Sequence, residues 1–258
     1  MATGSSDTRA AAFVQALRGN ALYAIIAVNA VVFVGMAVCA LCGASRVAVL
    51  LALPPSVDGL MHMPWTLLTY MVVHTDAMHL VFNMLWLYCF GALMMRGGGR
   101  AGRRLAAVYA GGGVAGGIVF LCACSLAPGV SAGPLLGASA AVLAVAVAVA
   151  FEMPDMELHF WLIGAVRLKW VVAAMVAIFC IGFTGSAAAT AAHAGGAAYG
   201  AVAHYGRLLL HRRRSSSAKA DMRDELDALL DKVKLSGYEA LSRRDKQRLF
   251  ELSHKVKR

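Results

Sequence analysis

The chain has 258 residues, of which 60% are hydrophobic and only 15% are charged, and its mean hydropathy is +0.67. Soluble domains are nearer half apolar and about a quarter charged, so this composition excludes an ordinary soluble domain and indicates a membrane protein. The length allows one bundle of about six spans of ~20 residues each, followed by a small tail.

The net charge of +10 is concentrated near the C-terminal end. Residues 207–258 contain 15 Lys/Arg and 8 Asp/Glu, so +7 of the total lies in that stretch. Basic residues that directly follow an apolar segment are the expected cytoplasmic flank of a membrane span. Aromatic and basic residues do not alternate along this stretch in a way that suggests base stacking, so we expect the lipid bilayer, and not nucleic acid, as its surroundings.

Apolar runs in chain order predict an all-α, polytopic membrane protein with a six-helix bundle over residues 21–210. A polar segment, residues 1–20, precedes the bundle and is expected in the cytoplasm. The connection 45–76 is only partly hydrophobic and contains Pro54-Pro55 and Pro64-Trp65, so we expect it at the membrane interface. The predicted spans are residues 21–41, 77–95, 105–127, 136–151, 168–181 (with a start nearer Phe160 as the alternative) and 187–210.

Residues 211–258 form a basic tail that differs from the bundle in composition. We expect a cytoplasmic helical hairpin, which residues 236–238 interrupt and in which Ser242 and Asp245 have the spacing of a capping box. A solvated tail with transient helices is the alternative. Apolar residues of the first helix recur at i, i+3, i+4 and i+7, namely Leu226, Leu229, Leu230 and Val233.

The basic residues in the connections predict the orientation of the bundle. When crossings alternate, the arginines after the second and sixth spans fall on the same side as those before the first and fifth spans. The opposite side holds only Arg46. Both termini are therefore expected in the cytoplasm.

Polar side chains within spans cost free energy unless they are paired, so they are the first candidates for function. Ser139 lies near the start of the fourth predicted span, and His193 lies in the sixth. Gly196 and Gly200 share a helix face with His193, which allows a neighbouring helix to approach closely. Such packing would bring the imidazole within ~2.6–3.2 Å of a hydroxyl, as nucleophile activation requires. The alternatives are a small packing serine and a histidine bonded to a backbone carbonyl.

His79 and Asn83 lie four residues apart on one face of the second predicted span. Both can present N–H donors, which an oxyanion in a dry site requires, although an interhelical hydrogen-bonded pair is the alternative. A metal site that uses His74 lacks a nearby glutamate or cysteine, so we predict no metal. Cys39 and Cys42 have CxxC spacing but lie in an apolar run, which favours inert buried thiols over a metal or redox site.

Three motifs together resemble the rhomboid family of intramembrane serine proteases. The first runs from Pro64-Trp65-Thr66 through His79-Leu80-Val81-Phe82-Asn83-Met84 to Trp86 and Gly91, the second is Gly137-Ala138-Ser139, and the third is Ala192-His193 with Gly196 and Gly200. The order of the motifs and their places in the spans also match over residues 20–210. The tail resembles one appended to many bacterial rhomboids. Considered apart from this resemblance, Trp65 and Trp86 are typical of side chains that anchor a helix at the membrane interface.

The resemblance implies a six-span bundle in the bacterial cytoplasmic membrane that cleaves transmembrane segments of membrane-protein substrates without a cofactor. Ser139 would be the nucleophile and His193 the general base. The family has no acidic third member, and the sixth predicted span contains no Asp or Glu. The Ser139 N–H, His79 and Asn83 would form the oxyanion hole. The glycines expected to allow close helix packing are Gly137, Gly196 and Gly200.

Three positions depart from the common pattern of the family. Ala140 replaces a glycine after the nucleophile, and Thr66 replaces an arginine in the first loop. Leu143 stands where tyrosine is common, so the packing beneath the His193 ring is expected to differ.

Two other functions are compatible with parts of this pattern. A catalytically silent rhomboid-like protein would bind membrane clients, but such proteins typically lack the serine or the histidine. A transporter or metal-binding bundle would carry an acid or a thiolate–histidine cluster inside a span, and the core of no predicted span contains one.

Overall fold

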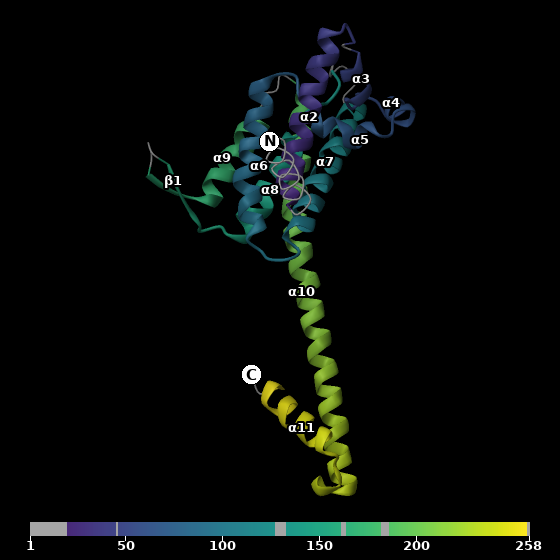
Figure 1. Ribbon diagram of the computed structural model, residues 1–258, viewed down its shortest axis with the longest axis vertical. Helices are drawn as coiled ribbons and strands as arrows, with labels where there is room; N and C mark the ends of the chain where they lie inside the picture. The colour runs from purple at the N-terminus through teal and green to yellow at the C-terminus, as the bar shows by residue number, and fades with distance from the viewer. Residues whose placement is uncertain (1–19, 45, 127–132, 161–163, 182–185, 257–258) are drawn as a thin grey trace, which may run out of the picture. The chain divides into compact units, whose positions relative to one another are not determined.

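The computed structural model describes residues 20–44, 46–126, 133–160, 164–181 and 186–256. The predicted N-terminal segment 1–20 therefore lies outside the described residues except for Asn20. Over the described part of the chain, the fold is mainly helical, as the composition predicts (Figure 1). The chain divides into two compact units, residues 1–204 and 205–258, which are taken separately.

Three helices in the first unit are long and apolar enough to cross a membrane, judged by length and composition. These are α2 (Ala21–Leu41), α6 (Ala77–Met95) and α7 (Ala101–Leu126). The first two have the predicted bounds, whereas α7 begins before the predicted Leu105. Two apolar helices are shorter, α8 (Ser139–Glu152) and α9 (Leu168–Cys180). The sixth predicted span forms the first part of α10 (Ala187–Ser236).

The connection between α2 and α6 consists of short helices, none of which is long enough to cross a bilayer. They are α3 (Val47–Leu51), α4 (Val57–His62), α5 (Thr66–Thr69) and η1 (Tyr70–Val72). The connection folds back on itself, because the Trp65 indole donates to the Leu50 carbonyl at 2.8 Å. Leu53 also pairs with Leu135 as an isolated antiparallel bridge, which ties the connection to the segment that leads into α8.

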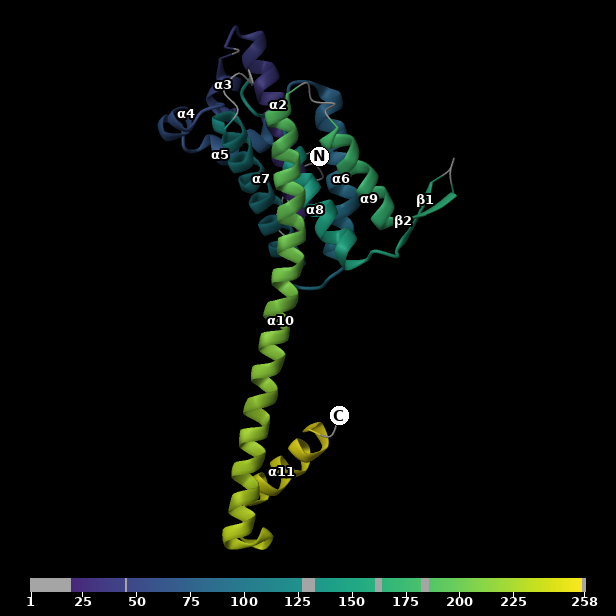
Figure 2. The same ribbon diagram turned by 180° about the vertical axis from the view of Figure 1, so that it is seen from behind.

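Helix α8 lies at the centre of the first unit, enclosed by its neighbours in both views (Figures 1 and 2). Every residue from Ser139 to Ala150 is buried. Small residues permit this enclosure, since a Cβ added at Gly116 of α7 would lie 2.7 Å from the Ala140 Cβ. A salt bridge closes the other end of this pair of helices, where Arg104 donates to Glu152 at 2.6 Å.

A two-stranded antiparallel hairpin joins α8 to α9 and extends away from the helices in both views (Figures 1 and 2). Strand β1 (Glu157–Phe160) pairs with β2 (Gly164–Arg167). The alternative start of the fifth span near Phe160 is therefore wrong, because that residue belongs to a strand. At the base of the hairpin, Asp155 accepts a hydrogen bond from Lys169 at 2.7 Å, which lowers the pKa of its carboxyl group.

The second unit is a hairpin of two helices. Helix α10 continues to Ser236, beyond the predicted end of the sixth membrane span near Leu210. Arg, Lys, Glu, Leu and Ala are good helix formers, and the charges that end an apolar run do not end a helix. Gly237 has a φ of 80° and stops α10. Helix α11 (Arg243–Val256) then begins where the Asp245 N–H donates to the Ser242 hydroxyl oxygen at 3.1 Å.

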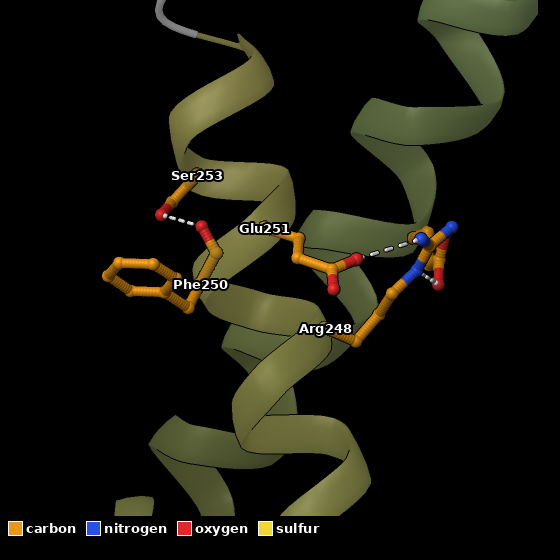
Figure 3. Close-up of polar contacts among 5 residues, drawn as sticks. Arg248, Phe250, Glu251 and Ser253 are labelled. Carbon is orange, nitrogen blue, oxygen red and sulfur yellow. Dashed lines mark hydrogen bonds and ion pairs between the residues drawn. The ribbon is translucent and has the colours of Figure 1, made fainter.

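An ion pair joins the two helices of this hairpin. The Arg248 guanidinium donates twice to the Glu225 carboxylate, at 2.7 and 2.9 Å. This bidentate pair lowers the pKa of Glu225. Figure 3 shows Arg248 turned towards the neighbouring helix, while Phe250 points to the other side of α11. Buried leucines at 229, 241 and 252 form the apolar centre of the unit.

Candidate active site

The backbone before α8 places Ser139 at the first residue of that helix. Gly137 has a φ of 106°, a conformation that side chains with a Cβ rarely adopt. A Cβ there would also lie 2.7 Å from the Cε1 atom of His79. The fourth span therefore begins later than the predicted Leu136, since helical geometry starts after this glycine. Gly137 contacts a side-chain ring, whereas we expected it to pack against a helix.

Ser139 and His193 are in direct contact. The Ser139 Oγ lies 2.6 Å from the His193 Nε2, and both residues are buried. Glycines on α10 make this approach possible. A Cβ at Gly196 would collide with the Ala140 carbonyl oxygen, and one at Gly200 would collide with the Ala144 carbonyl oxygen. The backbones of α8 and α10 therefore touch beside the serine–histidine pair.

The second ring nitrogen of His193 faces a backbone carbonyl. Its Nδ1 lies 3.3 Å from the Phe179 carbonyl oxygen of α9. A carbonyl only accepts hydrogen bonds, so Nδ1 carries the proton in this contact and Nε2 presents its lone pair to the Ser139 hydroxyl. The Phe179 ring also packs against the imidazole, with centroids 5.0 Å apart and planes at 75°. Leu143, where tyrosine is common in the family, is fully buried in the core.

His79 and Asn83 lie on α6 beside the serine–histidine pair. The Asn83 amide donates to the His79 carbonyl at 2.8 Å, which occupies one of its two N–H groups. The N-cap residue Asp76 accepts from the His79 backbone N–H at 2.8 Å and so fixes the start of α6. The sequence places these two side chains on one face, and the structure brings that face towards Ser139.

His74 supports the same region, although the sequence indicated no role for it beyond an unfavoured metal site. Its Nε2 accepts from the Ala138 backbone N–H at 3.4 Å, and its ring packs edge-on against His79 with centroids 5.1 Å apart. Sequence reasoning also missed Phe179. Neither residue belongs to a pattern that could have indicated these contacts, because both depend on how separate elements pack.

A cavity of ≈ 850 Å³ gives access to these groups. Ser139, His193, His79 and Asn83 all line it. The remaining wall is largely apolar and comes from the segment 133–136 before α8 and from several helices, with Phe82 and Trp86 of α6 and Met175, Ile178 and Phe179 of α9 among its members. Among the described residues, no group of three or more His, Cys, Asp or Glu side chains is placed to hold a metal ion.

Fold and cavity define a helical membrane protein with a serine–histidine pair inside an apolar bundle. A family model described as the rhomboid domain matches residues 61–210, which is more than half of the chain. The chain belongs to the rhomboid family. Residues 213–255 match a family of unknown function, DUF6576. No curated protein matches the chain.

Proposed function

We propose that the chain is an intramembrane serine endopeptidase that cleaves transmembrane segments of membrane-protein substrates. The observation that carries this proposal is the 2.6 Å contact between the Ser139 Oγ and the His193 Nε2 on the wall of a cavity. A hydroxyl becomes a useful nucleophile when a base within hydrogen-bond reach takes its proton. Family membership supports the same chemistry.

In the proposed reaction, the Ser139 Oγ attacks the scissile carbonyl carbon as its proton passes to the His193 Nε2. The tetrahedral intermediate collapses when the imidazolium gives this proton to the leaving amine, which releases one product and leaves an acyl-enzyme. Water then gives a proton to Nε2 and attacks the ester carbonyl. Return of that proton to Oγ releases the second product as an acid and restores the serine.

The developing oxyanion would lie beside the start of α8. The first N–H groups of a helix lack intrahelical partners, and the N-cap residue Ala138 forms no side-chain cap. These donors and the positive end of the helix favour an anion. The free N–H of the Asn83 amide and the His79 ring reach the same cavity and would donate to the oxyanion with the Ser139 N–H.

The length of α8 supports a site within the bilayer. Its 14 residues rise roughly 21 Å, less than the ~30 Å of a hydrocarbon core. In the proposed orientation α8 ends at the cytoplasmic side with Glu152, so its first residue, Ser139, lies below the outer surface and the cavity supplies its water. A substrate helix must unwind there, because its carbonyl groups are otherwise engaged in helical hydrogen bonds.

The proposed orientation has both termini in the cytoplasm of a bacterium, since the basic connections all fall on one side. A reporter that is active only outside the cytoplasm should be silent when it is fused after Arg214. The same reporter should be active when it is inserted at Pro134, in the connection before α8. The reverse pattern would refute this orientation.

Cleavage of a single-span model substrate by the purified protein in detergent tests the proposed activity. Ser139→Ala and His193→Ala should each abolish cleavage and labelling by a fluorophosphonate probe, and the double variant should be no worse than either single one. Ser125→Ala is a matched control, since that hydroxyl donates to the Leu121 carbonyl of its own helix. A Ser139→Ala protein that still cleaves would refute the dyad. A wild-type protein that captures substrates without cleaving them would identify a silent client-binding protein instead.

A further inference from the structure

Helix α9 ends against the imidazole of His193. Phe179 is the last residue but one of this helix, and its carbonyl oxygen lies 3.3 Å from the His193 Nδ1. The last four carbonyls of a helix lack intrahelical donors, so this acceptor is available to a side chain. Serine hydrolases with a triad usually place a carboxylate at the corresponding ring nitrogen. Within the described residues, no carboxylate contacts His193; a backbone carbonyl does.

The electrostatics of a helix end fit this position. Its carbonyls carry the negative end of the helix dipole, which stabilises a nearby cation. In the proposed reaction, His193 becomes such a cation each time Nε2 takes the Ser139 proton. The proton on Nδ1 remains in its hydrogen bond to the Phe179 oxygen throughout, so the end of α9 supplies both the orientation and the negative potential.

The Phe179 side chain acts on the same ring. Its centroid lies 5.0 Å from that of the imidazole at 75°, the edge-on geometry that aromatic pairs prefer. The contact restricts rotation of the imidazole about its Cβ–Cγ bond, and a half-turn would place ring carbons where the two nitrogens now face Ser139 and the Phe179 carbonyl. The Phe179 carbonyl therefore fixes the tautomer of the His193 imidazole, and the Phe179 ring fixes its orientation.

We infer that Phe179 is a positioning residue for His193, with its carbonyl in the place of a triad acid and its ring as a clamp. This inference rests on the proposed protease activity. It assigns to α9 a part in catalysis beyond lining the cavity.

The test compares Phe179→Leu with Phe179→Tyr in the full-length protein. Trp170→Leu is the control, because it removes an aromatic ring from the same helix at an exposed position outside the cavity lining. Removing the ring should lower kcat by about tenfold, or about 1.4 kcal/mol, with little change in KM. The tyrosine variant keeps the aromatic edge and should retain most of the activity. If Phe179 had only a structural role, Phe179→Leu would not lower kcat at constant KM, and Phe179→Tyr would not restore kcat.

A second measurement does not depend on turnover. Nitrogen NMR of protein labelled at histidine, with the His193 signals assigned by their loss in His193→Gln, reports the tautomer at mildly alkaline pH. In the wild type and in Phe179→Tyr, the imidazole proton of His193 should lie on Nδ1. In Phe179→Leu, that proton should exchange between Nδ1 and Nε2. A wild-type proton on Nε2, or a Phe179→Leu protein as active as the Trp170→Leu control, would overturn the inference. An inactive wild type with the Nδ1 proton in place would count against the protease and leave the positioning contact established.

Discussion

Gly196→Ala tests whether close backbone packing creates the serine–histidine contact. The added Cβ would lie 2.9 Å from the Ala140 Cα and closer still to the Ala140 carbonyl oxygen, whereas ordinary contact begins near 3.4 Å. The obstacle is backbone, so it cannot be relieved by a side-chain rotation. Helices α8 and α10 would therefore separate by about 0.5 Å or more next to Ser139. The 2.6 Å contact would lengthen towards the limit of a useful hydrogen bond.

The expected result is a loss of rate that exceeds the loss of stability. Overpacking costs about 1–3 kcal/mol, part of which the better helix propensity of alanine offsets. A misplacement of reacting groups by ~1 Å can lower kcat by about 100-fold. Cleavage and fluorophosphonate labelling should therefore fall by ~10–100-fold in a protein that remains folded by circular dichroism.

Gly206→Ala is the matched control for this experiment. Gly206 lies on the same helix, and a Cβ there would meet nothing within 4 Å. This variant should keep its activity and be as stable as the wild type or slightly more so. Wild-type cleavage by Gly196→Ala would show that the glycine contact does not set the distance between Ser139 and His193.

Three further predictions concern other contacts of the chain. Asn83→Ala removes both N–H donors without adding a charge, so it should lower kcat by ~10²–10³ with KM little changed and the protein still folded; a lower melting temperature at unchanged kcat would assign Asn83 to packing. Glu152→Gln weakens the largely buried salt bridge to Arg104 and should destabilise the bundle by about 1–3 kcal/mol, which thermal unfolding of the detergent-solubilised protein would measure against Glu157→Gln. The pKa of Glu225 is lowered by its pair with Arg248, so the pair stabilises the hairpin above the ordinary value of 4.5 and this contribution disappears as the pH falls through the lowered value. Hydrogen exchange in α11 should accelerate over that acid range in the wild type, and a Glu225→Gln protein with the same acid response would contradict this assignment.

The bounds of the apolar helices were predictable because hydropathy and caps act locally. Helices α2 and α6 begin and end at the predicted residues, and an N-cap side chain, Asn20 or Asp76, accepts a backbone N–H at the start of each. The predicted end of the sixth span did not indicate where α10 ends, because hydropathy follows the preference for lipid, whereas α10 continues through charged residues of good helix propensity. The strand pair after α8 was not predicted: residues 157–160 alternate polar and apolar side chains, but the alternation covers only these four residues.

The site could be predicted only in part. Polar residues in apolar surroundings indicated Ser139 and His193, and the glycines on the histidine face indicated close packing. The contact of His193 with Phe179 depends on where α9 ends relative to α10, and no residue spacing encodes that arrangement. Gly137 was expected in a helix interface, but its positive φ became apparent only in the backbone.

Helix α8 has a lipid-like composition, yet its residues from Ser139 to Ala150 are all enclosed by protein. Helix α2, in contrast, buries only Leu22 and Asn29 among its residues. Selection should therefore act on different side-chain properties in the two helices. Along most of α2, side chains can vary in size as long as they stay apolar, so exchanges among Leu, Ile, Val and Phe should have little effect on stability. Along α8, the volume of each side chain is under selection as well, so a larger apolar residue should be selected against just as a polar residue is.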